Sequence, residues 1–420
     1  MQPLPPLVDW LLMEHQVAQI LIDQERHGFH FDERSAWELA QTLQSEYGEA
    51  ADLLRDQFPV VAGQVHNPPR SNKTKGWHQG ASFTRLKETN PSSRDHLAWI
   101  LTNRCGVTLS QMTGTGKPMI DETVLTDIGT ETALLMLKCL TLTKQLGFLQ
   151  RGVNAWLKLS TSANRIHHHC SVEAATGRCT HKKPNLSQVP SEERFRKLFT
   201  ATPGLVMCGA DLAGIELRVL AHYLARYDGG KYAEVLLHGD IHQQNADAIG
   251  VSRKQVKTIT YAMIYGASDT RLGHAYDPAL PDKKAAAKGK EIRAAYISAI
   301  PGFGDLLSAV SQAAGRGFVK AIDGRKIPIK SPHSCLNFLL QGSAACIAKR
   351  WMVIANTALK DRAHQLAFVH DELQYETHSF NVDDVLSTLE STATQAGEYY
   401  NLRIPIAAEA KSGDNWSEVH

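Results

Sequence analysis

Residues 251–266 read VSRKQVKTITYAMIYG, and the interpretation of the chain starts from them. Four cationic or aromatic side chains recur in this stretch at intervals of four residues: Arg253, Lys257, Tyr261 and Tyr265. Side chains four residues apart lie on one face of an α-helix, so the pattern predicts a stripe of two cations and two rings, with Ser252 as N-cap and Gly266 as stop. The cations of such a face can bind phosphates, and its aromatic rings can pack against a sugar and base. An ordinary surface helix fits the same pattern.

The composition indicates a globular chain with a large core. At 420 residues, 43% of them hydrophobic, we expect two or three lobes. We expect no apolar run near the roughly 18 residues that span a membrane, and the start lacks the features of a secretory signal, so we predict a soluble intracellular protein. The seven cysteines include no C-x-x-C pair, which favours reduced thiols over disulfides or a zinc finger.

Charge is balanced overall but clustered locally. The formal net charge of +2 does not indicate a nucleic-acid partner. However, residues 57–87 contain no Asp or Glu, and further basic clusters lie in 178–197 and 283–293. Such stripes suit a groove that follows a phosphate backbone, although each fits a solvated surface equally well. Residues 60–79 are predicted to form a long basic loop.

Two aspartates are predicted at the ends of strands. Residues 205–210, LVMCGA, have the pattern of a buried strand, and Asp211 follows directly. Residues 366–376, LAFVHDELQYE, alternate on both sides of Asp371 and predict a β-hairpin with acids at its tip. A carboxylate at a strand end often serves metal-dependent phosphate chemistry, but a single one is weak evidence. The two can share a site only if their strands meet in one sheet.

Two other patterns suggest metals less well. Histidines and cysteines gather in one segment: His167, His168, His169, Cys170, Cys179 and His181. Adjacent strand residues point to opposite faces, so at most two of the three consecutive histidines share a side, and zinc is disfavoured. Asp23 and Glu25 form a D-x-E string of the type that holds metals in proofreading exonucleases. It lies in a helical pattern without a matching carboxylate motif, so we interpret it as a solvated helix face.

Five motifs follow one another along the chain: T-G-R with P-N-L (176–178, 184–186), D-x-x-x-I-E-L-R (211–218), R-x-x-x-K-x-x-x-Y-x-x-x-Y-G (253–266), N-F-L-L-Q (337–341) and H-D-E (370–372). In this order they resemble the motifs of family A DNA polymerases, the DNA polymerase I group. The resemblance covers nearly all of the chain and is to the phage replicative branch, without the exonuclease domain. It implies an α+β right-hand fold with helical thumb and fingers and an antiparallel-sheet palm.

The resemblance also implies a division of the chain into four segments. Residues 1–160 would form the thumb and connecting helices, and 161–222 the first part of the palm with Asp211. Residues 223–330 would form the fingers, and 331–420 the second part of the palm with Asp371.

Residue roles follow from the same motifs. Asp211 and Asp371 would bind the metals, with Glu372 as an accessory carboxylate and Lys257 as a catalytic cation. The incoming nucleotide would contact Glu216, His242, Arg253, Lys257, Tyr261 and Tyr265. Primer-template DNA would contact Arg178, Asn185, Asn337, Gln341 and His370. His333 stands where many family members carry Arg, which leaves that contact open.

The function implied is template-directed addition of deoxynucleotides to a primer 3′ end by two-metal nucleotidyl transfer. We expect two Mg²⁺ ions, a role in phage or viral DNA replication, and no intrinsic proofreading. The expected partners are primer-template DNA and deoxynucleoside triphosphates, for a monomer in the host cytoplasm with no membrane partner; a separate exonuclease or processivity factor is left open. Alternatives are a single-subunit RNA polymerase, a repair or translesion polymerase of the same family, and an inactive DNA-binding relic.

Overall fold

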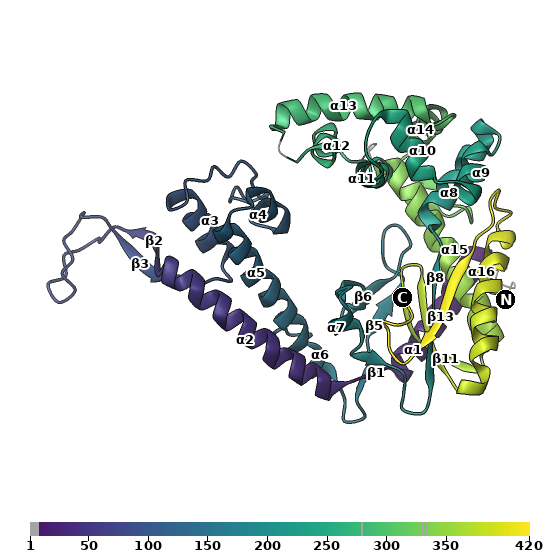
Figure 1. Cartoon of the computed structure of the whole chain (residues 1–420), viewed down its shortest axis with the longest axis horizontal. Helices are drawn as coiled ribbons and strands as arrows, with labels where there is room; N and C mark the ends of the chain where they lie inside the picture. Colours follow the sequence, from purple (N-terminus) through teal and green to yellow (C-terminus); the bar gives the residue numbers. More distant parts are fainter. Residues whose placement is uncertain (1–7, 279, 330, 332–333) are drawn as a thin grey trace, which may run out of the picture. The chain divides into compact units, whose positions relative to one another are not determined.

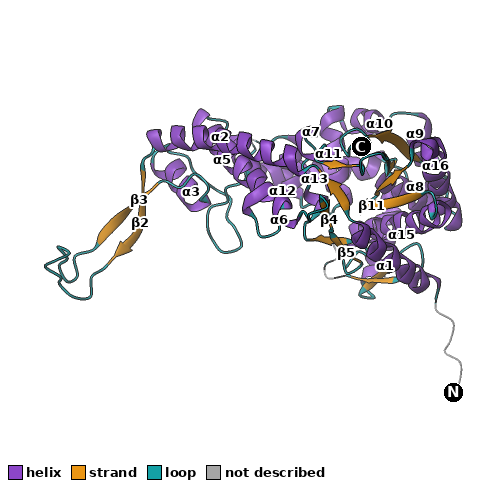
Figure 2. Cartoon of the chain, turned by 90° about the horizontal axis from the view of Figure 1, so that it is seen from below, coloured by secondary structure: helices purple, strands orange, loops and turns teal. Residues whose placement is uncertain are grey.

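The structure, a computed structural model, describes residues 8–278, 280–329, 331 and 334–420. The chain divides into two compact units, Met1–Glu33 with Leu159–His420, and Arg34–Lys158. Helices dominate both units and all named strand pairs are antiparallel, which confirms the predicted α+β class (Figures 1 and 2). The boundaries predicted after residues 160, 222 and 330 stay a prediction.

The unit Arg34–Lys158 is built mainly of helices. Its elements are α2 (Glu33–Gln57), β2 (Val60–His66), β3 (Phe83–Glu88), α3 (Arg94–Asn103), α4 (Glu122–Ile128), α5 (Glu131–Leu146), the π-helical turn η1 (Gly147–Arg151) and α6 (Trp156–Leu159). Leu54, Leu97 and Met136 are fully buried in its core. The side chains of Ser93, Asp121 and Thr130 cap α3, α4 and α5, each accepting a hydrogen bond from a backbone N–H of the first turn.

One stretch among the described residues, Glu131–Leu159, is long and apolar enough to cross a membrane by length and composition, although charged residues such as Lys138 and Lys144 interrupt it. The stretch is apolar where α5 packs one face into the core, and there Ala133, Met136 and Cys139 are fully buried. A core helix passes the same test, so this stretch is weak evidence for a membrane.

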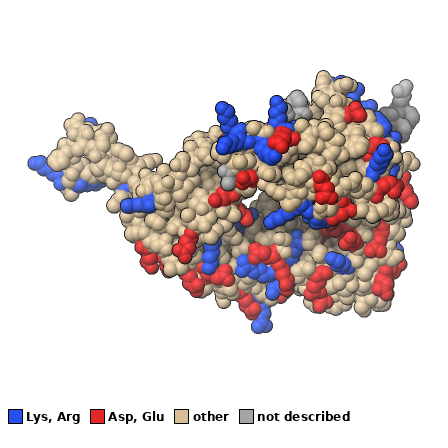
Figure 3. Space-filling model, turned by 45° about the horizontal axis from the view of Figure 1, so that its top comes forward, with Lys and Arg blue, Asp and Glu red and all other residues tan. Residues whose placement is uncertain are grey.

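The predicted loop over residues 60–79 is also partly wrong, because its first residues form strand β2, which pairs with β3. Val60, Val61 and Val65 favour extended backbone, a local preference that the loop prediction overlooked. Between the strands, the Trp77 ring packs at 4.7 Å from that of His66 and 5.9 Å from that of Phe83. Two cations approach the same indole: Lys75 at 4.8 Å and Arg85 at 5.3 Å from the centroid. The projecting ribbon in Figure 3 shows Lys and Arg but no acidic side chain.

The other unit is organised around a four-stranded sheet with the order β11-β12-β8-β13. Its strands are β8 (Val206–Leu212), β11 (Ala363–Val369), β12 (Glu372–Thr377) and β13 (Ala408–Gly413). Helix α16 (Val382–Tyr399) packs on β8 and β13, and α15 (Cys335–Leu359) packs on α16 (Figure 1). Gly209 in β8 is required by close approach, because a Cβ there would lie 2.6 Å from Gln374 Oε1 and 2.7 Å from Val419.

Helix α1 (Asp9–His27) packs on α15 and is tied to it by ion pairs. Glu14 bonds to Lys349 Nζ at 2.7 Å, and Asp9 to Arg350 at 2.7 Å. Three short strands form a second sheet beyond α1: β1 (Phe29–Phe31) between β4 (Arg165–Ile166) and β7 (Phe199–Thr200). Strands β5 (His169–Ser171) and β6 (Thr180–Lys182) pair as a separate two-stranded sheet.

The remaining elements include the helix predicted at the outset, α11, which contacts α10, α12 and α15. They are η2 (Leu186–Gln188), α7 (Glu193–Arg196), α8 (Ile215–Asp228), α9 (Lys231–His238), α10 (Ile241–Ile249), α11 (Arg253–Ile264), α12 (Asp269–Tyr276), α13 (Asp282–Ala299), α14 (Phe303–Ala314), β9 (Phe318–Lys320), β10 (Lys326–Pro328) and η4 (Ser379–Asn381). Gly289 lets α13 press against α12, since a Cβ there would lie 1.7 Å from Asp269 O.

Candidate active site

The sheet brings the two predicted aspartates together. Asp211, in β8, is in register with Glu372, the first residue of β12. The backbone N–H of Leu212 donates to the carbonyl oxygen of Asp371 at 3.1 Å. The turn before β12 contains His370, whose φ of 62° lies in the left-handed region. Carboxylates far apart in the sequence therefore meet at one edge of the sheet.

Ionising Asp211 and Asp371 together with Glu372 costs free energy, because the three charges are alike and close. Burial, and then the charges of Asp371 and Glu372, raise the pKa of Asp211 to about 7. Burial also raises the pKa of Asp371, while the Arg178 guanidinium opposes the rise. A cation bound between them would remove this cost, which makes the pair a candidate metal site.

The described residues contain no group of three or more His, Cys, Asp or Glu side chains arranged to hold a metal ion. In the His and Cys segment, His168 faces Gln24 instead, with 3.0 Å between their Nε2 atoms. A pair of aspartates nevertheless fits Mg²⁺, which binds proteins through one or two carboxylates and takes its other ligands from water and substrate phosphates.

Glu372 is held in place by three side chains. Its Oε1 accepts a hydrogen bond from Trp416 Nε1 at 2.5 Å and another from the Gln374 amide. The Nδ1 atom of His420 lies 3.3 Å from its Oε2. Glu372 is only 5% exposed, so its carboxylate has a fixed direction. Trp416 was not predicted as a site residue, because its role arises from a contact with a strand distant in sequence.

Helix α11 presents the predicted stripe. Ser252 and Gln255 form a capping box at its start, while Val256, Ile259 and Met263 face the core. Lys257 lies on the exposed side and has no ion-pair partner among the described residues. The rings of Tyr261 and Tyr265 stack with centroids 6.3 Å apart. The cations and rings thus follow one another along a single accessible face.

Glu216, in the first turn of α8, links Tyr265 to Arg178. The Tyr265 hydroxyl donates to its two carboxylate oxygens at 2.9 and 2.8 Å. Arg178 Nη2 donates to its Oε1 at 2.8 Å. Burial, and then the bond to Glu216, raise the pKa of Tyr265, so the hydroxyl stays a donor. Three predicted site residues are therefore assembled into one hydrogen-bonded group.

His242 begins α10 close to the cations of α11. Its pKa is lowered by burial first, and then by the charges of Arg253 and Lys257. Its Nδ1 atom is buried without a hydrogen-bond partner in the described part of the chain. Arg253 Nε is 2.8 Å from Asp240 Oδ2, the acid that also caps α10. The result is a cluster of two cations and an imidazole restrained by one carboxylate.

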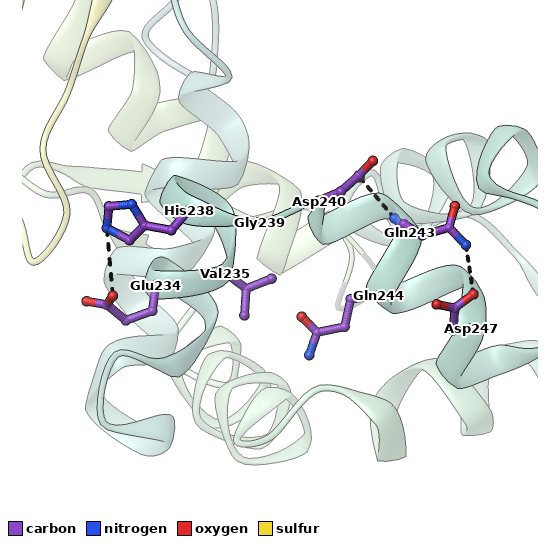
Figure 4. A pocket seen from close by; sticks show the side chains of 8 residues that line it. All are labelled: Glu234, Val235, His238, Gly239, Asp240, Gln243, Gln244 and Asp247. Atoms are coloured by element: carbon purple, nitrogen blue, oxygen red, sulfur yellow. Dashed lines mark hydrogen bonds and ion pairs between the residues drawn. The ribbon is translucent and has the colours of Figure 1, made fainter.

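A cavity of about 600 Å³ borders this cluster, between α9 and α10 (Figure 4). Its lining is mostly acidic or amide, including Glu234, Asp240 and Asp247. Glu234 lies 3.8 Å from His238, and Asp247 accepts a hydrogen bond from Gln243 at 2.7 Å. An acidic lining repels phosphates, so this cavity is not where the cluster would bind a nucleotide.

The predicted DNA-binding residues are dispersed. Arg178 and His370 lie near the carboxylates. Arg178 donates a hydrogen bond to Glu216, and burial lowers the pKa of His370, on which the charges of Glu216 and Glu372 also act. Asn185 caps η2, accepting from Ser187 N at 3.1 Å. Asn337 and Gln341 are both on α15, and the Asn337 Oδ1 atom is buried without a partner in the described ranges. His333 lies outside the described residues.

A sheet that aligns two aspartates beside a helix of cations and aromatic rings is the arrangement expected of a polymerase that transfers nucleotides. The chain belongs to DNA polymerase family A, whose profile matches residues 70–418, and it is a DNA-directed, template-dependent DNA polymerase. Enzymes of this family generally use divalent metal ions.

Similar proteins include two phage enzymes. The chain is 29% identical to the DNA-directed DNA polymerase of Enterobacteria phage T3 and equally to that of Escherichia phage T7, matching 97% of this chain and 70% of each relative. It is 30% identical to the DNA polymerase I of Pseudomonas aeruginosa over 80% of this chain and 39% of that one. The fold is similar to the POL domain of Pol1 from M. smegmatis, solved with DNA primer-template and dNTP: TM-score 0.79, 24% identity, 97% of this chain and 70% of that chain.

Proposed function

We propose that the chain extends primers by two-metal nucleotidyl transfer during phage DNA replication, and that it does so without proofreading. The observation that supports this most directly is the register of β8 with β12, which sets Asp211 beside Asp371 and Glu372. The phage setting rests on the similarity to the T3 and T7 enzymes over 97% of the chain.

Asp211 and Asp371 are the residues that would hold the metals. Two bound Mg²⁺ ions would supply activation of the primer 3′ hydroxyl and charge neutralisation on the triphosphate. Asp211 must lose its proton before it can bind a cation. With a pKa of about 7 in the metal-free protein, that proton leaves as the pH rises through neutrality, so metal affinity should increase from pH 6 to pH 8.

The fingers residues would receive the triphosphate. Lys257 is exposed and unpaired in the described part of the protein, so its ammonium is free for a phosphate oxygen. Arg253 would exchange the Asp240 carboxylate, now at 2.8 Å, for a phosphate. His242 would add a third donor. Tyr265 and Glu216 would close on the sugar and base, and base pairing with the template would select the nucleotide.

The partners we propose are primer-template DNA and deoxynucleoside triphosphates, with Arg178, Asn185, Asn337, Gln341 and His370 on the DNA. The M. smegmatis POL domain was solved with both ligands, which supports this choice. We expect a monomer that acts in the cytoplasm of the host cell. The division into thumb, palm and fingers at the boundaries given above belongs to the same proposal.

The absence of proofreading is supported by the state of the D-x-E string, which lies on α1. Asp23 accepts a hydrogen bond from Gln19 at 3.1 Å, and Glu25 is 2.8 Å from His169 Nδ1. Gln24 between them is only 2% exposed. Asp23 is engaged within α1 and Glu25 by a histidine of β5, so the two acids are not arranged as a metal pair.

One primer-extension assay with matched and mismatched primers tests the proposal. We expect addition only of the deoxynucleotide that the template specifies, dependence on a divalent ion, and no shortening of a mismatched primer. Efficient use of ribonucleotides would indicate an RNA polymerase instead. An absence of extension would indicate a DNA-binding relic, and shortening of the mismatched primer by contaminant-free protein would contradict the lack of proofreading.

A further inference from the structure

A second polar cavity lies next to the catalytic carboxylates. It has a volume of about 380 Å³ and is bounded by α7 and the C-terminal residues. Six residues line it: Ser191, Glu193, Arg196, Ser417, Glu418 and His420. None of them belongs to the five motifs that indicated the polymerase.

Arg196 brings a buried donor without a hydrogen-bond acceptor to this cavity. Its guanidinium lies 5.5 Å from the centroid of Trp416, and its Nε atom is buried without a hydrogen-bond acceptor. No carboxylate within the described ranges pairs with it, whereas Arg194 on the same helix is 2.8 Å from Glu192. Buried donors of a charged group cost free energy when unsatisfied, and a planar guanidinium suits an oxyanion. Arg196 is therefore poised for an anion.

The two acids that line the cavity, Glu193 and Glu418, do not pair with Arg196. Glu418 accepts hydrogen bonds from Asp414 N at 2.8 Å and from Asn415 Nδ2 at 2.6 Å, within its own turn. Glu193 is exposed in the first turn of α7. The donors left to a ligand are the Arg196 guanidinium, the Ser191 hydroxyl and the Nε2 atom of His420, whose Nδ1 faces Glu372.

The cavity adjoins the catalytic centre through Glu372, which is in register with Asp211. Trp416 and His420, which contact Glu372 at 2.5 and 3.3 Å, are beside or in its wall. The charge of His420 acts on Asp211, while Arg178 and Glu216 act on Asp371. The cations of α11 face the triphosphate in the proposed function. A phosphate bound in the cavity of Arg196 would therefore be one other than the triphosphate.

We propose that the cavity binds a phosphate group through Arg196, and that this group is a backbone phosphate of the primer next to its 3′ end. The proposal rests on the proposed polymerase function. Pyrophosphate released by the reaction offers the same chemistry, but its leaving position belongs to the α11 cations. Arg196 would thereby fix the primer terminus relative to Asp211.

The test compares Arg196→Gln with Arg196→Lys and with Arg194→Gln as the matched control on the same helix. Affinity for primer-template is measured by fluorescence anisotropy without nucleotide or metal, so the result does not depend on catalysis. The primers carry one neutral methylphosphonate in turn at each of the last four linkages. Thermal melting checks that each variant is folded, and pyrophosphorolysis gives the dependence on pyrophosphate concentration.

We expect Arg196→Gln to weaken primer-template binding about tenfold, from loss of a charge-assisted hydrogen bond, with Arg196→Lys intermediate and Arg194→Gln unchanged. At one linkage, the methylphosphonate should weaken the wild type but add nothing to Arg196→Gln. Equal sensitivity of both proteins at every linkage would overturn the proposal. A change confined to the pyrophosphate dependence would overturn the assignment to the primer. If the wild type binds DNA as expected yet extends nothing, the polymerase function fails separately.

Discussion

At the scale of single residues, Tyr261 of α11 and Tyr265, its C-cap, differ in what their hydroxyls contact. The Tyr265 hydroxyl is engaged by Glu216 at 2.8 Å, while that of Tyr261 has no hydrogen-bond partner in the described part of the chain. Burial, and then the charges of Glu216 and Asp371, raise the pKa of Tyr261, so its hydroxyl is a free, neutral donor beside the catalytic acids. It is therefore available to a nucleotide that brings no 3′ hydroxyl of its own.

We predict that the enzyme accepts dideoxynucleotides nearly as well as deoxynucleotides, and that Tyr261→Phe removes this tolerance. One net hydrogen bond of about 0.5–1.5 kcal/mol, or up to about 3 with charge assistance, corresponds to a roughly two- to hundredfold change. The measurement is competitive incorporation of the two substrates opposite one template base. If the variant discriminates no more than the wild type, Tyr261 does not contact the sugar. Deoxynucleotide incorporation by the variant serves as the control.

At the scale of elements, one buried carboxylate joins α1 to the sheet. Glu376 in β12 has no exposed side-chain surface and is 2.6 Å from His27 Nε2 and 3.5 Å from Arg165. It also accepts hydrogen bonds from the backbone N–H and hydroxyl of Thr202 at 2.8 and 2.7 Å. Burial alone would raise its pKa, but these bonds outweigh burial and lower the pKa to about 2.

Glu376→Gln should therefore lower the unfolding free energy at pH 7 by roughly 3 kcal/mol, since one pKa unit is worth about 1.4 kcal/mol. A depressed carboxyl pKa stabilises the fold above the ordinary value of 4.5, and the contribution is lost as the pH falls from there towards 2. The wild type and the variant should converge over that range. Urea unfolding at pH 7, 5, 4 and 3 measures this, with exposed Glu398→Gln as the unchanged control. A gap that persists undiminished at pH 3 would contradict the account.

The β2–β3 ribbon makes a second prediction at this scale. Lys75 and Arg85 flank the Trp77 ring, in a segment without acids, and we expect both to contact duplex phosphates. Replacing both with Ala should reduce the slope of log affinity against log salt by about 2, since each phosphate contact contributes roughly 0.9. Titrations of primer-template from 50 to 200 mM salt give the slope. Arg34→Ala, an exposed cation paired with Glu38 at 3.1 Å, is the control and should leave it unchanged. An unchanged slope in the double variant would show that the ribbon does not touch DNA.

At the scale of the whole molecule, the parts that local pattern determines were predictable. The four-residue spacing of cations and rings gave α11 with its cap, because helical periodicity is written directly in the sequence. The alternation around Asp371 gave the β11–β12 hairpin for the same reason. That Asp211 lies beside it required the strands to meet in one sheet, and the register of β8 with β12 supplies this.

Contacts between distant segments could not be predicted. Trp416 reaches Glu372, and His27 reaches Glu376, through packing that leaves no periodic signal in either segment. Arg196 lay in a basic cluster that fitted any solvated surface, and its lack of a partner is visible only in the fold. The loop prediction for residues 60–79 misses strand β2 because Gly and polar residues interrupt and follow its valines. The sequence pattern shows the local preference of each segment for helix or strand, whereas the site depends on which segments contact each other in the fold.

The central claim is that Asp211 and Asp371 together hold the metals of nucleotidyl transfer. The most direct measurement is the rate of one templated incorporation by Asp211→Asn and Asp371→Asn, with primer-template affinity measured separately. Exposed Asp305→Asn on α14 is the control and should behave as the wild type. Loss of several kcal/mol of transition-state stabilisation predicts a rate at least about 10³-fold lower in either variant, with DNA affinity within about threefold of the wild type. Incorporation by either variant at more than about a tenth of the wild-type rate would contradict the two-metal account.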